Sequence, residues 1–182
     1  MTKKNLIEKV LSSAVVFQGR FLKIWRDEVE LPNGHQSFRE YIKHPGAATI
    51  VPHLDNGKFL MIYQYRHSVG QVFLEFPAGK ADLGEKTEIT AARELQEEVG
   101  FQPGKLTFLT HIHPVIGYSN ERIDLYLAEN LKPAPKLPDP DEILETVELT
   151  LEEIQAKIWN HEISDVKTQI CVFWLLRHFG KF

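Results

Sequence analysis

The chain has 182 residues, 43% of them hydrophobic, and a formal net charge of −4 at pH 7. This is enough chain for one sizeable core and too little for two. The negative charge argues against the basic surface that non-specific nucleic-acid binding requires, so we expect no nucleic-acid partner. The N-terminal residues contain no apolar stretch of signal-peptide length, and no run approaches the ~18 residues of a membrane span. We therefore expect a cytoplasmic protein with no membrane partner.

Residues 10–43 are rich in β-branched and aromatic residues and predict a small antiparallel β-meander. Asn33-Gly34 is the signal of a tight hairpin between its second and third strands. So small a sheet has exposed edges and too little core to be stable alone. It can serve as a lid over its own chain or as an arm exchanged with a second copy. The expected strands are Val10–Gln18, Phe21–Glu30 and Ser37–Lys43.

We place the domain boundary after residue 45, so that an N-terminal meander (1–45) precedes a main domain (46–182). The main domain alternates strands with helices, and this pattern predicts an α/β sandwich with a mixed sheet. The proline-rich segment Lys132–Asp141 is expected to be a loop. The expected strands are Ala47–Pro52, Lys58–Arg66, Val72–Phe76, Leu106–His113 and Arg122–Glu129, and the expected helices are Glu88–Val99, Leu151–Trp159 and Asp165–Phe179.

The C-terminal helix contains the single cysteine, Cys171, which cannot form an internal disulfide. Its apolar surroundings favour a core-packing role over a reactive one. Ser164 is the expected N-terminal cap of this helix. The residues expected on its buried side are Val166, Ile170, Phe173 and Trp174.

The helix expected at Glu88–Val99 is amphipathic, and Gly100 is placed to end it with a left-handed cap. Glu94 and Glu98 are four residues apart, so both carboxylates project from one face, with Glu97 beside them. Like charges at that spacing destabilise a helix unless a cation lies between them. Carboxylate oxygens on a rigid element suit Mg²⁺. Taken alone, the pattern also fits a solvated acidic helix face.

The full spacing around this helix decides between the two interpretations. Gly79 is followed after five residues by Glu85, after seven more by Arg93-Glu94-Leu95, then by Glu97-Glu98 and Gly100. This spacing resembles the Nudix box at every defined position. The resemblance implies an α/β/α sandwich and Mg²⁺-dependent cleavage of a nucleoside diphosphate linked to another group. Mn²⁺ is a possible substitute for Mg²⁺.

The resemblance also implies roles for individual residues. The metal ligands would be Glu94, Glu97, Glu98 and the carbonyl oxygen of Ala78. The carboxylates Glu97 and Glu98 count as catalytic in this sense. Arg93, also in the catalytic motif, is expected to orient Glu85 or a neighbouring carboxylate rather than to touch substrate.

Four residues outside the box are candidate substrate ligands because they resemble segments of sugar-nucleotide-cleaving Nudix enzymes. Arg66 ends a strand and can clamp phosphate bidentately, although an unremarkable surface arginine fits the same position. Glu75 has a counterpart in those enzymes. Arg39 and Glu40 resemble a segment that reaches nucleotide across a dimer, and the whole meander resembles their dimerisation arm. Trp25 could stack a base, but a buried strand tryptophan is the better interpretation.

The attacking water needs a base from outside the helix, because metal-bound carboxylates are poor bases. The segment Pro138–Glu145 offers several acids on a loop. In ADP-ribose-cleaving relatives a similar segment carries the catalytic glutamate, and Glu142 matches its position. Asp141 and Glu145 remain alternatives.

We therefore expect a homodimeric, Mg²⁺-dependent pyrophosphatase for ADP-ribose or related nucleoside diphosphate sugars, releasing a nucleoside monophosphate and a sugar phosphate. A hydrolase of dinucleoside polyphosphates or nucleoside triphosphates is an alternative, but such relatives are usually shorter and lack the meander. A non-catalytic nucleotide sensor is a third, and loss of the glutamates would mark it.

One departure from the family pattern bears on the sugar. ADP-ribose-specific relatives typically carry a proline sixteen residues after the last glycine of the box. This chain has Ile116 there, with Pro114 two residues earlier. Proline would fix φ near −65° and stiffen the loop. We expect isoleucine to leave the loop more adaptable and to relax discrimination between sugars.

Overall fold

The computed structural model describes residues 6–20, 22–136 and 141–181. The chain divides into two compact units. The N-terminal unit contains the described residues up to His44 together with Val115–Glu121, and the main unit contains Pro45–Pro114 and the described residues from Arg122 onward. No helix in these described ranges is long and apolar enough to cross a membrane.

The N-terminal unit is the expected antiparallel meander, with strand order β1-β2-β3. Its strands are β1 (Lys9–Gln18), β2 (Lys23–Glu30) and β3 (Gln36–Ile42). Gly34 adopts a left-handed φ of 83° in the turn between β2 and β3, as the hairpin signal requires. The segment Val115–Glu121 joins this unit because the Ile42 N–H donates to the Tyr118 carbonyl at 2.9 Å.

Trp25 lies half-buried on β2, and the ammonium of Lys43 sits 3.4 Å from the centroid of its ring. We expected Trp25 to be buried in its strand, and the structure buries it only in part. The lysine occupies a ring face, which is the favourable cation–π position. A base would have to displace Lys43 to stack on that face.

The main unit is built on two sheets. The first is mixed, in the order β7-β4-β10-β9, with β4 parallel to β10 and its other pairs antiparallel. The second is antiparallel, in the order β12-β5-β6, and β8 pairs with β11 in a short ribbon. The strands are β4 (Ala47–Pro52), β5 (Phe59–Arg66), β6 (Gln71–Glu75), β7 (Ala78–Lys80), β8 (Phe101–Gln102), β9 (Lys105–Ile112), β10 (Ile123–Glu129), β11 (Lys132–Pro133) and β12 (Leu144–Leu149).

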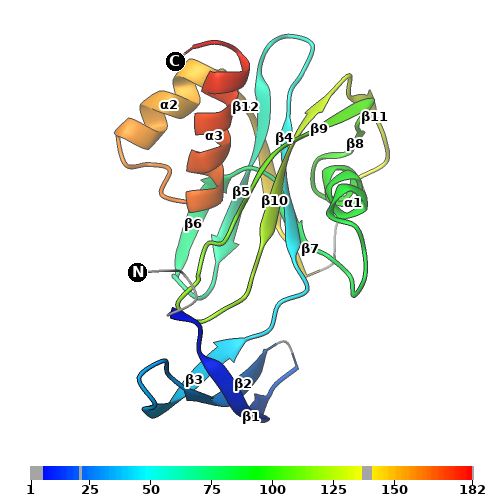
Figure 1. Ribbon diagram of the computed structural model, residues 1–182. Helices are drawn as coiled ribbons and strands as arrows, with labels where there is room; N and C mark the ends of the chain where they lie inside the picture. The colour runs from blue at the N-terminus through cyan, green and yellow to red at the C-terminus, as the bar shows by residue number, and fades with distance from the viewer. Residues whose placement is uncertain (1–5, 21, 137–140, 182) are drawn as a thin grey trace. The chain divides into compact units, whose positions relative to one another are not determined.

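Helices cover both faces of these sheets, which confirms the expected α/β/α sandwich. Helix α1 (Thr87–Val99) lies on one side, and α2 (Leu151–Trp159) and α3 (Val166–His178) lie on the other (Figure 1). All six residues of β4 are buried, as a strand covered on both faces requires. Alternate β4 residues therefore face opposite layers. Ala48 and Ile50 pack with α1, whereas Ala47 and Val51 pack with α2 and α3.

Two expectations about the C-terminal half were wrong. Asp165, not Ser164, caps α3, accepting a hydrogen bond from the Thr168 N–H at 2.9 Å. Val166 and Phe173 are exposed, and the buried apolar side is Cys171, Val172 and Leu175. Apolar residues occur all around this helix, so periodicity alone does not fix its buried face. The core-packing role of Cys171 is confirmed by its burial.

Candidate active site

The turn between β6 and α1 is fixed at both ends by backbone hydrogen bonds. The Ile50 N–H of β4 donates to the Pro77 carbonyl at 2.9 Å, and the Ala81 N–H donates to the Gly46 carbonyl at 3.0 Å. Between these bonds, Ala78 pairs with Thr49 in the β4–β7 ladder. The central strand of the fold therefore sets where the Ala78–Gly79 backbone lies.

Two carboxylates of α1 pack directly against this backbone. Glu98 is 1% exposed and accepts a hydrogen bond from the Ala78 N–H at 3.0 Å. Glu94 is 8% exposed, and a Cβ on Gly79 would lie 1.9 Å from its Oε1 atom. Residue 79 must therefore be glycine for Glu94 to occupy this position. The structure brings Ala78, Glu94 and Glu98 together.

Burial is the largest influence on both carboxylates, and it favours their neutral forms. It raises the pKa of Glu94 to about 7, against the opposing charge and hydrogen bond of Arg93. It raises the pKa of Glu98 well above its usual value, and the charges of Glu94 and Glu142 raise it further. Such a pair gains from a cation that compensates its charge.

Arg93 is hydrogen-bonded to the carboxylates around it. Its Nη1 atom donates to Glu94 Oε1 at 2.7 Å and to Glu97 Oε2 at 3.0 Å, and its Nη2 atom donates to Glu85 Oε2 at 3.3 Å. Glu85 also accepts from the Thr90 hydroxyl at 2.8 Å and from the Asp82 N–H at 3.0 Å. Arg93 thus links Glu85, in the loop before α1, to Glu94 and Glu97 on the helix.

A second charged cluster contains two of the predicted substrate ligands. The Arg66 guanidinium donates from Nε and Nη2 to the two oxygens of Glu75, at 2.8 and 2.9 Å. Lys167 of α3 donates to Glu75 as well. Glu75 is 1% exposed, so its carboxylate is engaged within the protein, whereas Arg66 keeps an exposed edge.

The candidate bases lie in and before β12. Pro138–Pro140 fall outside the described residues, whereas Asp141, Glu142 and Glu145 are described. The charge of Glu142 raises the pKa of both Glu94 and Glu98, which places it within electrostatic reach of the pair. Glu145 pairs with Tyr63, on the opposite face of the sheet from Gln64 and Arg66. The geometry therefore favours Glu142 over Glu145.

The two remaining predicted substrate ligands belong to β3 of the N-terminal unit. Arg39 donates to Glu8 at 2.5 Å, and Glu40 accepts from Arg26 at 2.6 Å. Both pairs are exposed and so hold these side chains weakly.

The residues of the main unit fit a divalent cation by their chemistry. Within the described ranges no three acidic, histidine or cysteine side chains converge into a complete metal site, and Glu97 turns to Arg93. Mg²⁺ needs only one or two protein carboxylates, the rest being waters and substrate phosphates. Glu94 and Glu98, nearly buried, with raised pKa values and beside the Ala78 backbone, meet that need.

Lys167 and Asp165 are site-adjacent residues that sequence reasoning missed. Lys167 lies 92 residues from Glu75 in the chain, and no motif or periodicity links the two. The only sequence signal was a lysine in the first turn of a helix that is otherwise largely apolar.

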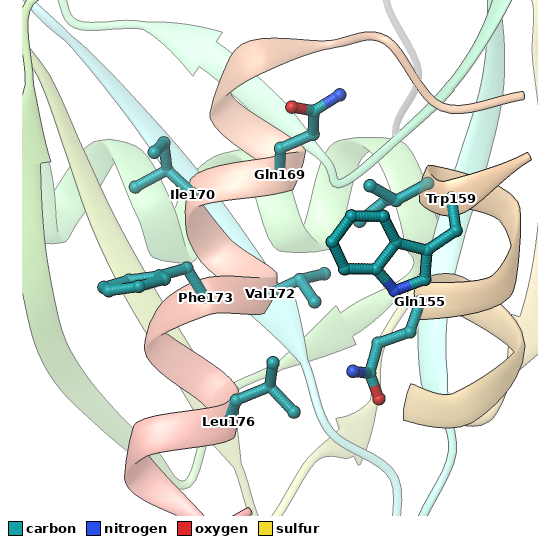
Figure 2. Close-up of a pocket in the computed structure, with 8 residues that line it drawn as sticks. Gln155, Trp159, Gln169, Ile170, Val172, Phe173 and Leu176 are labelled. Carbon is teal, nitrogen blue, oxygen red and sulfur yellow. The ribbon is translucent and has the colours of Figure 1, made fainter. Parts of the chain in front are cut away.

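A groove of about 410 Å³ between α2 and α3 is not the active site. In the described part of the chain its lining is apolar apart from Gln155 and Gln169, as Figure 2 shows. It offers no carboxylate or cation for chemistry on a phosphate. The acidic cluster around Glu94 and Glu98, and not this groove, is the candidate active site.

Comparison with known families identifies the class of protein. Residues 43–168 match the NUDIX domain, and residues 8–42 match the nucleoside diphosphate sugar hydrolase N-terminal domain. The first match covers more than half of the chain, so the chain belongs to the Nudix family, and the resemblance seen in the box is confirmed. The protein is a Nudix hydrolase.

Individual relatives agree with this assignment. The chain is similar to an ADP-ribose pyrophosphatase of Bacillus subtilis (strain 168), 37% identical over 174 residues and 94% of each chain. It is also similar to a methanol dehydrogenase activator of Bacillus methanolicus, 38% identical over 170 residues and 92% of each chain. Its fold matches a crystal structure of an ADP compounds hydrolase over 100% of both chains, with a TM-score of 0.88 and 25% identity.

The contact between Gly79 and Glu94 yields a first prediction. Gly79→Ala should displace the Glu94 carboxylate, because its Cβ would overlap Oε1, but the fold should survive because a flexible side-chain end can move. We expect weaker Mg²⁺ binding by calorimetry with little change in melting temperature. Gly117→Ala is the matched control, since its added Cβ meets nothing within 4 Å. Unchanged Mg²⁺ affinity in Gly79→Ala would contradict the assignment.

The raised pKa values of Glu94 and Glu98 predict a pH-dependent stability without metal. Each carboxyl has a pKa near 4.5 in the unfolded state and a higher pKa in the folded state, about 7 for Glu94. At pH values between these two pKa values, the folded state binds more protons than the unfolded state. The contribution of these two carboxyl groups to the free energy of unfolding is therefore fully present below pH 4.5 and is lost as pH rises through this window. Each kcal/mol lost lowers the melting temperature by about 2–4 °C.

This loss is measured as the difference in melting temperature between the wild type and a Glu94→Gln/Glu98→Gln double variant, both in the presence of a chelator, from pH 5 to 8. The difference should favour the double variant increasingly as pH rises, and Mg²⁺ should stabilise only the wild type. A melting-temperature difference that does not change with pH would contradict the raised pKa values of Glu94 and Glu98.

Proposed function

We propose that the protein hydrolyses the pyrophosphate bond of ADP-ribose and other nucleoside diphosphate sugars in a Mg²⁺-dependent reaction. The products are a nucleoside monophosphate and a sugar phosphate. The observation that carries the proposal is the nearly buried carboxylate pair Glu94 and Glu98, packed against the Ala78–Gly79 turn. The match of residues 8–42 to the nucleoside diphosphate sugar hydrolase N-terminal domain supports the substrate class.

The cation would be held by Glu94, Glu98 and the Ala78 carbonyl, with Glu97 near them. When bound, Mg²⁺ (or Mn²⁺) would neutralise charge on both phosphates and orient the attacking water. Glu142 takes the proton of that water as general base. Arg93 holds Glu94, Glu97 and Glu85 in place and does not touch substrate.

Arg66 is the proposed phosphate ligand of the main unit, because its guanidinium retains an exposed edge after pairing with Glu75. Glu75 then acts through Arg66 and not on substrate. On the same face of β5, the Gln64 Oε1 atom is buried without a hydrogen-bond partner among the described residues. Arg39 and Glu40 are proposed to reach nucleotide across a dimer, as in the sugar-nucleotide-cleaving enzymes that their segment resembles.

The alternatives find less support. Glu94, Glu97 and Glu98 are all present, so nothing marks a sensor that has lost its chemistry. Hydrolases of dinucleoside polyphosphates usually lack the meander that this chain contains.

We also propose a homodimer formed by the meander. Every residue of β1 is exposed, including large apolar side chains that a monomer does not normally leave uncovered. A second copy of the same sheet would cover them and satisfy the open strand edges. These apolar side chains are Val10, Leu11, Val15, Val16 and Phe17.

A prediction for the base compares two acids three residues apart. Glu142→Gln should lower kcat by roughly 10²–10⁴-fold, the usual contribution of a general base, with a small change in KM. Glu145→Gln, whose carboxylate lies on the opposite face, should retain near wild-type kcat and serves as the control. If Glu142→Gln keeps wild-type kcat while Glu145→Gln or Asp141→Asn loses activity, the base comes from this segment but is not Glu142.

The substrate panel tests the proposed function directly. With Mg²⁺, we expect cleavage of ADP-ribose and of at least one of GDP-mannose, ADP-glucose and UDP-glucose, with kcat/KM values within about 200-fold of each other. Ile116, the departure that motivates this breadth, is 82% exposed, and proline there removes neither turn hydrogen bond donated to Val115 by Tyr118 and Ser119.

Ile116→Pro should therefore sharpen the preference for ADP-ribose, whereas Ile116→Ala should not. A wild-type preference above about a thousandfold, beyond what small pocket differences give, would show a dedicated ADP-ribose enzyme. No cleavage of any member of the panel would overturn the proposed function.

For the dimer, sedimentation at micromolar concentration should show two copies of the chain. Val10→Asp/Val16→Asp places charges among the exposed apolar side chains of β1 and should give monomers. The control Leu83→Asp changes a leucine of the main unit that is 98% exposed and should leave the dimer intact. A wild-type monomer would contradict the proposal.

A further inference from the structure

Glu75 is the buried centre of a network of four charges in the main unit. Its two oxygens accept from Arg66, and one of them also accepts from the Lys167 ammonium. Lys167 in turn lies 3.0 Å from Asp165 Oδ2. The network contains two acids and two bases and is therefore electrically balanced. Removing one partner from such a buried set leaves an uncompensated charge.

Arg66 is the member of this network that also faces the active site. A guanidinium has five N–H donors, and Glu75 takes one on Nε and one on Nη2, so the Nη1 edge can serve another acceptor. The side chain is 39% exposed and projects from the same face of β5 as Gln64. Burial lowers the pKa of Arg66, but its bonds to Glu75 and the charge of Glu98 raise it overall, so Glu98 is within electrostatic reach.

The first turn of α3 holds the other side of the network. Thr168 is buried, and its hydroxyl accepts a hydrogen bond from the Phe76 N–H at 3.0 Å. Lys167 holds Glu75, the residue immediately before Phe76. Two residues later, the Ala78 N–H donates to Glu98. One turn of α3 therefore fixes the strand end that positions both Arg66 and the turn against Glu98.

We propose that Lys167 is a positioning residue for substrate binding, which holds the Glu75 carboxylate so that Arg66 presents its Nη1 edge to the phosphates. This inference rests on the proposed function. Without Lys167, Glu75 and Asp165 carry one negative charge more than Arg66 can balance. Arg66 is then drawn toward them, and its outer edge turns away from substrate.

The test measures kcat, KM and ADP affinity in Lys167→Met, with ADP titrated calorimetrically as a probe of diphosphate binding. We expect KM to rise and ADP affinity to fall by roughly tenfold to a hundredfold, the value of one charge-assisted hydrogen bond. The kcat value and the Mg²⁺ activation constant should change little. Lys167→Arg keeps the positive charge and should retain most of the wild-type ADP affinity and KM.

Two further variants separate positioning from stability. Lys157→Met removes a lysine from an exposed ion pair with Glu162 and should leave KM and ADP affinity unchanged. Arg66→Met should reproduce the loss, and adding Lys167→Met to it should cause no further loss, because both act through one contact. If Lys167→Met does not fold, Lys167→Gln, which keeps a side-chain hydrogen-bond donor and loses only the charge, is measured instead and should show the same fall in ADP affinity.

A change confined to melting temperature or active fraction, or losses that add in the double variant, would overturn the role of Lys167. Failure of the proposed function has a different signature, because wild-type protein would then cleave no nucleoside diphosphate sugar. In that case the ADP titration still decides: equal affinity in wild type and Lys167→Met overturns the inference, and reduced affinity supports it.

Discussion

The candidate active site depends on one contact, the packing of two carboxylates from α1 against the Ala78–Gly79 backbone. Glu98 accepts the Ala78 N–H, and Glu94 fills the space that a Cβ on Gly79 would need. The backbone is placed by its ladder with β4, the strand buried on both faces. The hydrophobic core thus holds two acidic groups close together and away from water, where their charge demands compensation.

Charge is distributed unequally between the two polar clusters of the main unit. Around Glu75 the acids and bases balance, so this cluster is suited to holding Arg66 in one place. Around Glu98 they do not, because Arg93 pairs with Glu94, Glu97 and Glu85 while Glu98 has only a backbone donor in the described structure. A balanced cluster gives rigidity, and an unbalanced one gives affinity for a cation. The two lie within electrostatic reach of each other.

The sequence predicted the parts of this arrangement that are local in the chain. The box spacing placed Glu94 and Glu98 on one helix face beside the Ala78–Gly79 turn, and short apolar runs predicted the central strands. It did not predict β12, because the segment Leu144–Leu149 is short, does not alternate strictly (Glu145 and Thr146 are both polar) and follows a proline-rich stretch. Nor did it give the buried face of α3 or the role of Lys167. Those depend on contacts 92 residues apart, which only the tertiary fold creates.

The central claim is that Glu94 and Glu98 form a cation site on which hydrolysis depends. Its most direct test is calorimetric titration of Mg²⁺, with turnover on ADP-ribose, for wild type and Glu98→Gln. The amide keeps the volume and loses the charge. The account predicts a folded variant in which Mg²⁺ affinity and turnover fall together by orders of magnitude. Near-normal turnover of Glu98→Gln at saturating Mg²⁺ would contradict it.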